Sequence, residues 1–349
     1  MKDKMFLSLD LLLPDELEQI QLYINNLLNI KESTRVTNTK YQEKYNNIKC
    51  PKCNGTNIIK NGHKNETQRY KCKECNTFFS ISTKTLSSHI KINFNILITI
   101  MKNMLDGKNL EDTSKDTKIS IREVYNIRIK IMDTLKIFRE KTILSGIIEM
   151  DEKYISLSFK GTRKDKMPRE SKKSSHDNTA SGISKEDVCI LGAIDENDNL
   201  LLIVSGLASA GIKDLKNGYD GLIKEGSTII TDEKKSYIKF AKDNKLNLKQ
   251  IKSGNHSTKD GYNINTLNQV FSELDKYIAN FNGLSTRHLQ QYLDFFVYRK
   301  HLRYTIEYIK QSKELYLELI KGNSNLINDK ICKTKMPIDV DNIYGVNFK

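Results

Sequence analysis

Hydrophobic residues recur with helical spacing in the first part of the chain and with strand-like spacing after residue 146. Over residues 86–140 the apolar positions follow the i, i+3, i+4, i+7 pattern, which predicts helices. An earlier amphipathic helix is predicted over residues 14–30, where a proline and acids precede the apolar positions. A polar stretch follows it, so residues 1–45 are interpreted as an N-terminal helix and a linker.

From residue 146 the chain has short β-branched or alternating apolar runs, separated by turn residues. After residue 232, helical segments alternate with one short strand. Strands first and then alternation of strand and helix are typical of an α/β domain with a mixed sheet. This domain is predicted over residues 146–310, and residues 311–349 are assigned to a C-terminal tail.

The charge of the chain favours a polyanionic partner. Of its 349 residues, 57 are Lys or Arg and 43 are Asp or Glu, which gives a formal net charge of +14. Nucleic acid is the first candidate for such a partner and an anionic membrane surface the second. Most of the basic residues are Lys, in a chain also rich in Asn and Ile, a bias that an AT-rich genome produces in any protein. The charge therefore supports nucleic-acid binding without establishing it.

The apolar runs are too short for a membrane protein. None approaches the roughly 18 residues of a membrane span, so we expect a cytoplasmic protein without a membrane partner. The length excludes a single small binding module, because about 150 residues per domain predicts two or three domains.

Four cysteines form two C-x-x-C pairs with 18 residues between them. This is the spacing of a zinc site, and four thiolates suit a structural, tetrahedral Zn²⁺ without an open position. In a reducing compartment a metal site is favoured over a disulfide or redox pair, which is the alternative. Short strands and turns between the pairs predict a zinc ribbon over residues 46–80. The predicted zinc ligands are Cys50, Cys53, Cys72 and Cys75.

A capping box, S-x-x-E, begins a helix at Ser120. With the segment before it, this helix resembles a helix-turn-helix over residues 109–137, within a DNA-binding segment at 86–140. Amphipathic helix pairs with basic outer faces are common, so a purely structural pair is the alternative. The second helix would present three basic residues to a DNA groove: Arg122, Arg128 and Lys130.

A basic, polar segment over residues 160–173 interrupts the predicted strands. One interpretation is a loop that clamps flanking or target DNA, with Arg163 and Lys164 as contacts. The other is a solvated insert without a function of its own.

Acidic residues occur inside and after the predicted strands. Glu149 and Asp151 alternate with apolar residues, so both point to one face of a strand, and Glu152 points to the other. Acids on a hydrophobic strand are costly to bury unless they are paired or bind a metal. Asp232 follows another apolar run directly, where a ligand at the carboxyl end of a strand is expected. The alternative for Asp232 is a cap of the helix that follows.

Three segments follow the ribbon and the helix pair in a specific order: IEMDEKYISL, STIITDEKKSYIKFAKDN and NINTLNQVFSELDKYIANFNGLSTRHLQQYLDFF. With these, residues 46–305 resemble bacterial insertion-sequence transposases that have a ribonuclease-H-like DDE catalytic domain. The similarity is to the branch whose third catalytic residue is often Asn. It implies a ribonuclease-H-like mixed sheet with flanking helices. The family's catalytic residues fall on Asp151, Asp232 and Asn268, with 35 residues between the last two.

The resemblance also implies Mg²⁺ at these three residues. Two hard cations about 3.5–4 Å apart suit phosphoryl transfer and require oxygen ligands. Asn268 offers only a neutral carbonyl oxygen, so we expect weaker metal binding than with Glu. The family's Lys, seven positions after the Asn, falls on Asp275, and Lys276 follows it. Either Lys276 reaches across to a DNA phosphate or the function of this Lys is lost. The structural alternative is that Asp275 and Lys276 belong to a solvated helix face.

These observations predict an insertion-sequence transposase that binds the ends of its element and catalyses metal-dependent strand cleavage and strand transfer. Its partners would be double-stranded DNA, at the element ends and the target, and further copies of the chain in a homo-oligomeric synaptic complex. A catalytically inactive DNA-binding protein derived from a transposase is the alternative. A zinc-ribbon RNA-processing nuclease is a third interpretation.

Overall fold

The computed structural model describes residues 48–64, 67–80, 83–84, 92, 94–170, 183–252, 254–255, 257–281, 283–302, 331 and 334–344. The helix predicted over residues 14–30 and most of the predicted tail lie outside these residues. The chain divides into two compact units, Met1–Ser88 and His89–Lys349.

The first unit contains a small antiparallel sheet around the four cysteines. Its strands are β1 (Ile58–Lys64), β2 (Thr67–Cys72) and β3 (Phe78–Ser80), in that order. The hydrophobic core consists of Cys50, Tyr70, Cys72 and Phe79, and the two rings stack with centroids 5.8 Å apart. So small a core requires an additional stabilising element, such as a bound metal, to remain folded.

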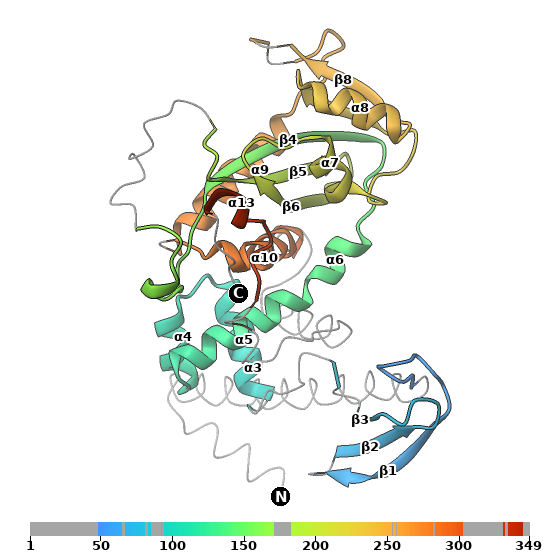
Figure 1. Cartoon of the computed structure of the whole chain (residues 1–349), viewed down its shortest axis with the longest axis vertical. Helices are drawn as coiled ribbons and strands as arrows, with labels where there is room; N and C mark the ends of the chain where they lie inside the picture. The colour runs from blue at the N-terminus through green and yellow to red at the C-terminus, as the bar shows by residue number, and fades with distance from the viewer. Residues whose placement is uncertain are drawn as a thin grey trace, which may run out of the picture. The chain divides into compact units, whose positions relative to one another are not determined.

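The second unit is built on a mixed five-stranded sheet with the order β6-β5-β4-β7-β8 (Figure 1). Strands β4, β5 and β6 are antiparallel, whereas β7 is parallel to both β4 and β8. This is the ribonuclease-H-like mixed sheet that the sequence resemblance implies, so the predicted fold class is confirmed. The bounds are β4 (Ile147–Ser156), β5 (Asp187–Asp195), β6 (Leu200–Leu207), β7 (Thr228–Asp232) and β8 (Asn247–Ile251).

Helices cover both faces of this sheet (Figure 1). On one face, α7 (Ile212–Tyr219) and α8 (Lys235–Asp243) bury a core that includes Met150 and Tyr237. On the other face lie α9 (Asn265–Ala279) and α10 (Leu289–Leu302). Covering both faces explains why strand β5, next to the central strand β4, is an almost continuous buried run.

Among the described residues, four helices precede the sheet, and two of them, α5 and α6, pack against α10. Arg139 forms an ion pair with Asp294 at 2.9 Å, and the rings of Phe138 and Tyr298 lie 5.2 Å apart. The N-cap predicted for the third of these helices is present, because the Ser120 hydroxyl accepts a hydrogen bond from the N–H of Glu123 at 3.3 Å. The four are α3 (Phe94–Leu105), α4 (Leu110–Thr117), α5 (Ile121–Thr134) and α6 (Lys136–Lys141).

Three short helical turns complete the second unit: η1 (Lys164–Lys166), η2 (Thr286–His288) and α13 (Asp341–Tyr344). Thr286 joins η2 to the end of the central strand, since its N–H donates to the Ser158 carbonyl and its hydroxyl accepts from the Ser158 N–H. Within the described part of the chain, no helix is both long and apolar enough to span a bilayer.

Candidate active site and zinc site

Two of the predicted catalytic acids lie side by side just beyond the point where the parallel pairing of β4 with β7 ends. The parallel register pairs Glu149 of β4 with Ile230 of β7, which brings Asp151 next to Asp232. Carboxylate oxygens of Asp151, Glu152 and Asp232 all lie within 4.8 Å of one another. Three carboxylates at this spacing are the hard oxygen donors that Mg²⁺ or Mn²⁺ prefers.

The alternative assignment of Asp232, as a helix cap, is wrong. Helix α8 begins at Lys235, its N-cap is Lys234, and no side chain caps it. Asp232 instead ends strand β7 with its side chain exposed. It therefore lies at the end of a strand, where its carboxylate is available to a ligand, and is not part of the helix.

Glu152 is a member of the acid cluster for which the sequence predicted no role. As the alternation predicts, it faces the layer of α8, where its carboxylate accepts from Lys234 Nζ at 2.8 Å and from the Tyr237 hydroxyl at 3.2 Å. Burial raises the pKa of Glu152, and the hydrogen bond and charge of Lys234 oppose that rise. The signal for it in the sequence is its position directly after Asp151 on the same strand.

Without a bound cation, the environment of the acid cluster destabilises the ionised form of its carboxyl groups. Burial is the largest cause that raises the pKa of Asp151 to about 6, and the charges of Asp232 and Glu152 add to it. The N–H of Glu152, which donates to Asp151 Oδ1 at 2.8 Å, acts in the opposite direction. A bound divalent cation would compensate this charge, so the residues present fit a metal site.

Helix α9, which carries Asn268, is fixed to the central strand by Glu149. The Glu149 carboxylate accepts a hydrogen bond from the N–H of Leu267 at 2.8 Å, in the first turn of a helix that has no cap from its own N-cap residue. Gly192, paired with Asp151 across the sheet, allows a close approach, since a Cβ there would lie 2.5 Å from the Phe271 ring. Asn268 follows Leu267 and is exposed at this end of the helix.

The position of the family's Lys is occupied by Asp275, which forms an ion pair with a residue of strand β4. Asp275 lies 2.6 Å from the ammonium of Lys153, which is two residues after Asp151 on β4. Residues two apart on a strand share a face, so Lys153 lies on the face of Asp151. Lys276 is exposed. The sequence analysis missed Lys153, although its alternation with Asp151 was a usable signal.

Of the predicted DNA contacts, Arg122, Arg163 and Lys164 are exposed, but Arg128 and Lys130 are not. Arg128 is 8% and Lys130 2% exposed, so their predicted presentation to a groove is wrong. Helix α5 is central in its layer, with nine of its 14 residues buried. One nitrogen of Arg128, Nη2, donates to three oxygens of the α3–α4 turn and of α4: Lys108 O, Asn109 O and Thr113 Oγ1, at 2.8, 3.2 and 2.6 Å.

The four cysteines converge in the first unit. Their Sγ atoms lie within 4.8 Å of one another, with 3.4 Å between Cys50 and Cys75 and 3.6 Å between Cys53 and Cys72. Tetrahedral zinc with Zn–S bonds of about 2.3 Å requires S–S separations near 3.8 Å. Hydrogen bonds with the side chain and backbone of Thr77 lower the pKa of Cys75 to about 6, which favours the thiolate that a metal needs. The cluster thus fits a four-thiolate zinc site.

The fold and the acid cluster together place the second unit in the ribonuclease-H-like class. Residues 143–301 match the family model of the ISXO2-like transposase domain. The resemblance to insertion-sequence transposases is confirmed by this match.

Two further proteins are similar to this chain. It is 21% identical over 259 residues to a Halobacterium salinarum protein named "Uncharacterized protein in transposable element ISH50", a match that covers 74% of this chain and 86% of that protein. The crystal structure of a pre-cleavage Mos1 transpososome aligns with 65% of this chain and 79% of that chain, at 12% identity and a TM-score of 0.24.

Proposed function

We propose that this protein is the DNA transposase of an insertion sequence, which binds the element ends and catalyses Mg²⁺-dependent strand cleavage and strand transfer. The observation that carries the proposal is the placement of Asp151 and Asp232 side by side on two adjoining parallel strands, inside the segment that matches the ISXO2-like transposase domain. Asn268, on the helix that Glu149 fixes to the same strand, is the proposed third ligand.

The protein's own residues would prepare the site for two successive displacements at phosphorus. When bound, two divalent cations supply Lewis-acid stabilisation of the attacking and leaving oxygens. Asp151, Asp232 and Asn268 would hold them. In the first step a water attacks a phosphate of one strand and breaks its bond to the 3′-oxygen, which leaves as a 3′-hydroxyl. In the second step that hydroxyl attacks a phosphate of the target DNA and displaces the 3′-oxygen of the target strand. Both steps have the same in-line geometry, so one site serves both.

DNA binding is assigned to basic residues of both units. In the zinc ribbon, Arg69 and Lys71 lie 5.5 Å from the ring of Phe78, which is itself 50% exposed. An exposed aromatic ring between two cations is a suitable surface for a nucleic acid. In the second unit, the proposed phosphate contacts are Arg122 on α5 and the exposed pair Arg163 and Lys164. Because two element ends must be held together, the active form is a homo-oligomer acting in the cytoplasm.

The second candidate is a DNA-binding protein that has lost strand cleavage. Two observations favour it: the neutral side chain of Asn268 in the third ligand position, and Asp275 in place of the family's Lys. Both candidates predict DNA binding that weakens with added salt. Only the transposase predicts metal-dependent cutting.

A cleavage assay separates the two candidates. A plasmid that carries the gene's own flanking DNA is incubated with the full chain and Mg²⁺ or Mn²⁺, using wild type, Asp232→Ala and the matched control Glu233→Ala, an exposed neighbouring acid. Cuts at defined ends by wild type and Glu233→Ala, but not by Asp232→Ala, support the transposase. DNA that is bound but cut by none of the three supports the binding protein.

A further inference from the structure

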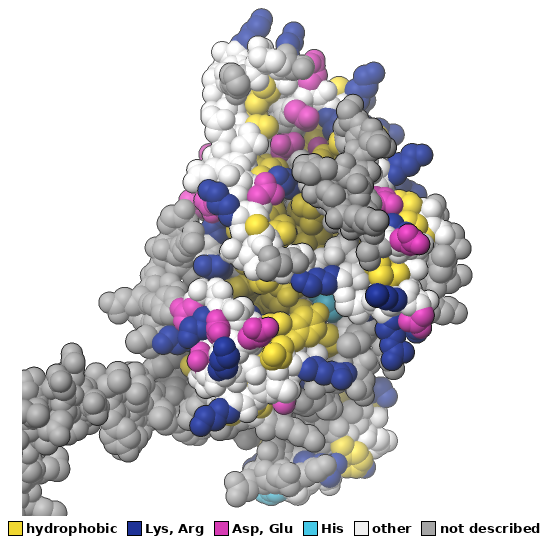
Figure 2. Space-filling view, turned by 90° about the vertical axis from the view of Figure 1, so that its left-hand side faces the viewer, with side chains coloured by type: hydrophobic (Ala, Val, Ile, Leu, Met, Phe, Trp, Pro, Cys, Tyr) yellow, Lys and Arg dark blue, Asp and Glu magenta, His cyan; other side chains and the backbone are white. Residues whose placement is uncertain are grey.

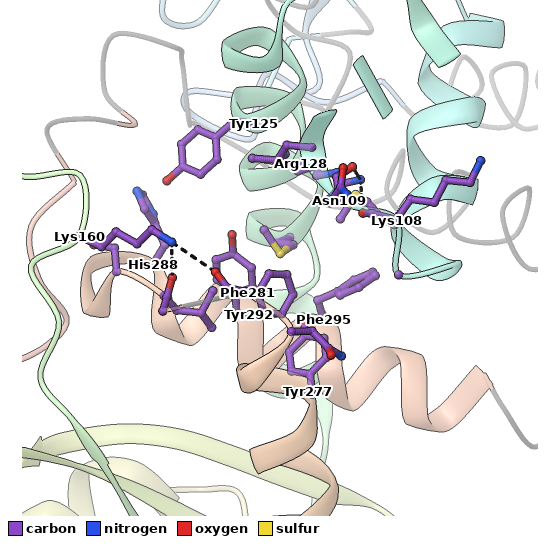
Figure 3. A pocket seen from close by; sticks show the side chains of 18 of the residues that line it. Lys108, Asn109, Tyr125, Arg128, Lys160, Tyr277, Phe281, His288, Tyr292 and Phe295 are labelled. Atoms are coloured by element: carbon purple, nitrogen blue, oxygen red, sulfur yellow. Dashed lines mark hydrogen bonds between the residues drawn. The ribbon is translucent and has the colours of Figure 1, made fainter. Parts of the chain in front are cut away.

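A cavity of about 580 Å³ lies in the second unit, apart from the acid cluster. Its walls come from the α3–α4 turn and α5 on one side and from α9, α10 and the loop between them on the other (Figure 3). Asp151, Glu152, Asp232 and Asn268 are not among the described residues that line it. In Figure 2 hydrophobic side chains gather in the middle of the view, with Lys and Arg side chains around them.

Aromatic rings form one wall of this cavity (Figure 3). The ring of Phe281 lies 5.0 Å from that of Tyr277 and 5.0 Å from that of Tyr292, both at steep interplanar angles. Tyr125 lines the opposite wall, on α5. Flat apolar faces of this kind suit a planar, aromatic ligand.

Three buried polar atoms in the walls have no hydrogen-bond partner: Arg128 Nε, Tyr277 Oη and His288 Nδ1. Their residues are 8%, 6% and 3% exposed. The other ring nitrogen of His288 bonds the backbone of Ile331, which leaves Nδ1 as an acceptor. Unsatisfied buried groups are costly, and in native proteins such groups are usually satisfied by an ordered water or a ligand. Three such atoms around one cavity favour a ligand with both donors and acceptors.

The cavity also has a cation without a counterion. Four basic residues line it, against one acid, Glu111. Lys108 is paired with Asp116, and the Lys160 ammonium donates to the carbonyls of Phe281 and Gly283. Arg128 forms no ion pair with a carboxylate of the described residues. A buried guanidinium in this state is stabilised by an anionic ligand.

We propose that this cavity binds a single nucleotide, with its base against the rings of Tyr277, Phe281 and Tyr292 and its phosphate on the side of Arg128. A purely apolar ligand would leave Arg128 unpaired, and inorganic phosphate would leave the rings uncovered. The assignment of this nucleotide to an unstacked position of bound DNA rests on the proposed function. A free nucleotide has the same chemistry, and the experiment distinguishes the two.

The test is equilibrium binding to the full chain without divalent metal. The chain has no Trp, so the fluorescent base 2-aminopurine is read against a low protein background. The probes are its free deoxynucleoside monophosphate, a duplex with one unpaired 2-aminopurine, and the fully paired duplex. An unpaired base is cheaper to unstack, so we expect the unpaired duplex to bind more tightly than the paired one.

The variants separate this cavity from general effects of buried hydroxyls. Tyr277→Phe removes only the unpartnered hydroxyl, and we expect about fivefold weaker binding, the loss of one hydrogen bond. Ser285→Phe fills the cavity from its wall and should weaken binding more. The matched control is Tyr219→Phe, because Tyr219 also buries an unpartnered hydroxyl but belongs to the core under α7 and α8. Its affinities should equal those of wild type.

Each outcome decides the inference. Weakened binding in Tyr277→Phe and Ser285→Phe alone supports it, and whichever probe responds, free or unpaired, identifies the source. Equal affinities in all four proteins, or full competition by inorganic phosphate at the same concentration as the nucleotide, would overturn it. The readout needs no cleavage, so a chain that binds the nucleotide but never cuts DNA removes the proposed function alone. A chain that cuts its ends but binds neither probe removes this inference alone.

Discussion

Glu149 holds the N-terminus of α9 across 118 residues of sequence, through the 2.8 Å hydrogen bond from the N–H of Leu267 to its carboxylate. A carboxylate at this position satisfies an orphan N–H and complements the positive end of the helix dipole. The same residue alternates with Asp151 on β4, so the strand that carries this proposed metal ligand also positions the helix of Asn268. Strand β4 therefore positions both Asp151 and the helix that carries Asn268.

Replacing Glu149 should affect both stability and chemistry. Glu149→Ala leaves α9 without a cap, which should cost about 1 kcal/mol of unfolding free energy and slow the cleavage of element ends. Glu149→Gln keeps an oxygen acceptor and should lie between Ala and wild type. Denaturant melts and single-turnover cleavage measure the two effects, with the exposed Glu140→Ala as the control. Wild-type behaviour of Glu149→Ala in both assays would contradict this role.

The position of Lys153, paired with Asp275, predicts that this side chain contacts a DNA phosphate near the site. Lys153 shares the strand face of Asp151, so Lys153→Met should slow cleavage about tenfold, the loss of one charge-assisted contact. The exchanged pair, Lys153→Asp with Asp275→Lys, should recover most of the rate because it returns a cation to the same place. The comparison is Lys276→Met, which we expect to cleave nearly as wild type does. A larger loss in Lys276→Met would instead support the prediction made from the sequence.

Stability of the second unit should fall in mild acid because of His288. Burial lowers the pKa of this side chain to about 4, whereas an exposed His titrates near 6.5. The unfolded chain therefore takes up the proton first, and stability that is present above about pH 6.5 is lost as the pH falls toward 4.

Between about pH 7 and pH 5 this linkage should cost about 2 kcal/mol. Chemical denaturation at the two pH values measures it, in wild type, His288→Gln and the exposed control His301→Gln. His288→Gln should lose less stability than the other two. The same pH dependence in all three proteins would show that another group is responsible.

Removing zinc should unfold the first unit selectively. Its buried core within the described residues is the cluster of Cys50, Tyr70, Cys72 and Phe79, so a bound metal should supply much of its folding free energy. Hydrogen exchange in the presence of a chelator should show lost protection in β1 and β2 and unchanged protection in α10. Cys72→Ser should have the same effect without chelator. Protected β1 and β2 amides in the metal-free protein would contradict a zinc-dependent fold.

Local patterns in the sequence predicted much of this architecture. Alternation along β4 placed Glu149 and Asp151 on one face and Glu152 on the other, and the structure has them so because a strand repeats every two residues. The mixed sheet and its helices followed from apolar periodicity and from the family resemblance. The strand end at Asp232 was recognised, but local sequence did not separate a ligand from a helix cap.

Long-range packing produced the differences. The burial of Arg128 and Lys130 depends on what surrounds α5, which the periodicity of a single helix does not reveal. The Lys153–Asp275 pair joins residues 122 positions apart, and only the close packing of α9 over Gly192 brings such residues together. The local pattern had suggested that these charged residues contact solvent or DNA. Tertiary contacts instead determine their positions in the fold.

The central claim is that Asp151 and Asp232 serve both chemical steps in one site. Strand transfer alone tests it most directly, with a pre-cleaved element end that already carries a 3′-hydroxyl, a supercoiled target plasmid and Mg²⁺. Wild type and Glu233→Gln should join the two DNAs, whereas Asp151→Asn and Asp232→Asn should bind the same DNA without joining it. Joining by either Asn variant at the wild-type rate would contradict the account.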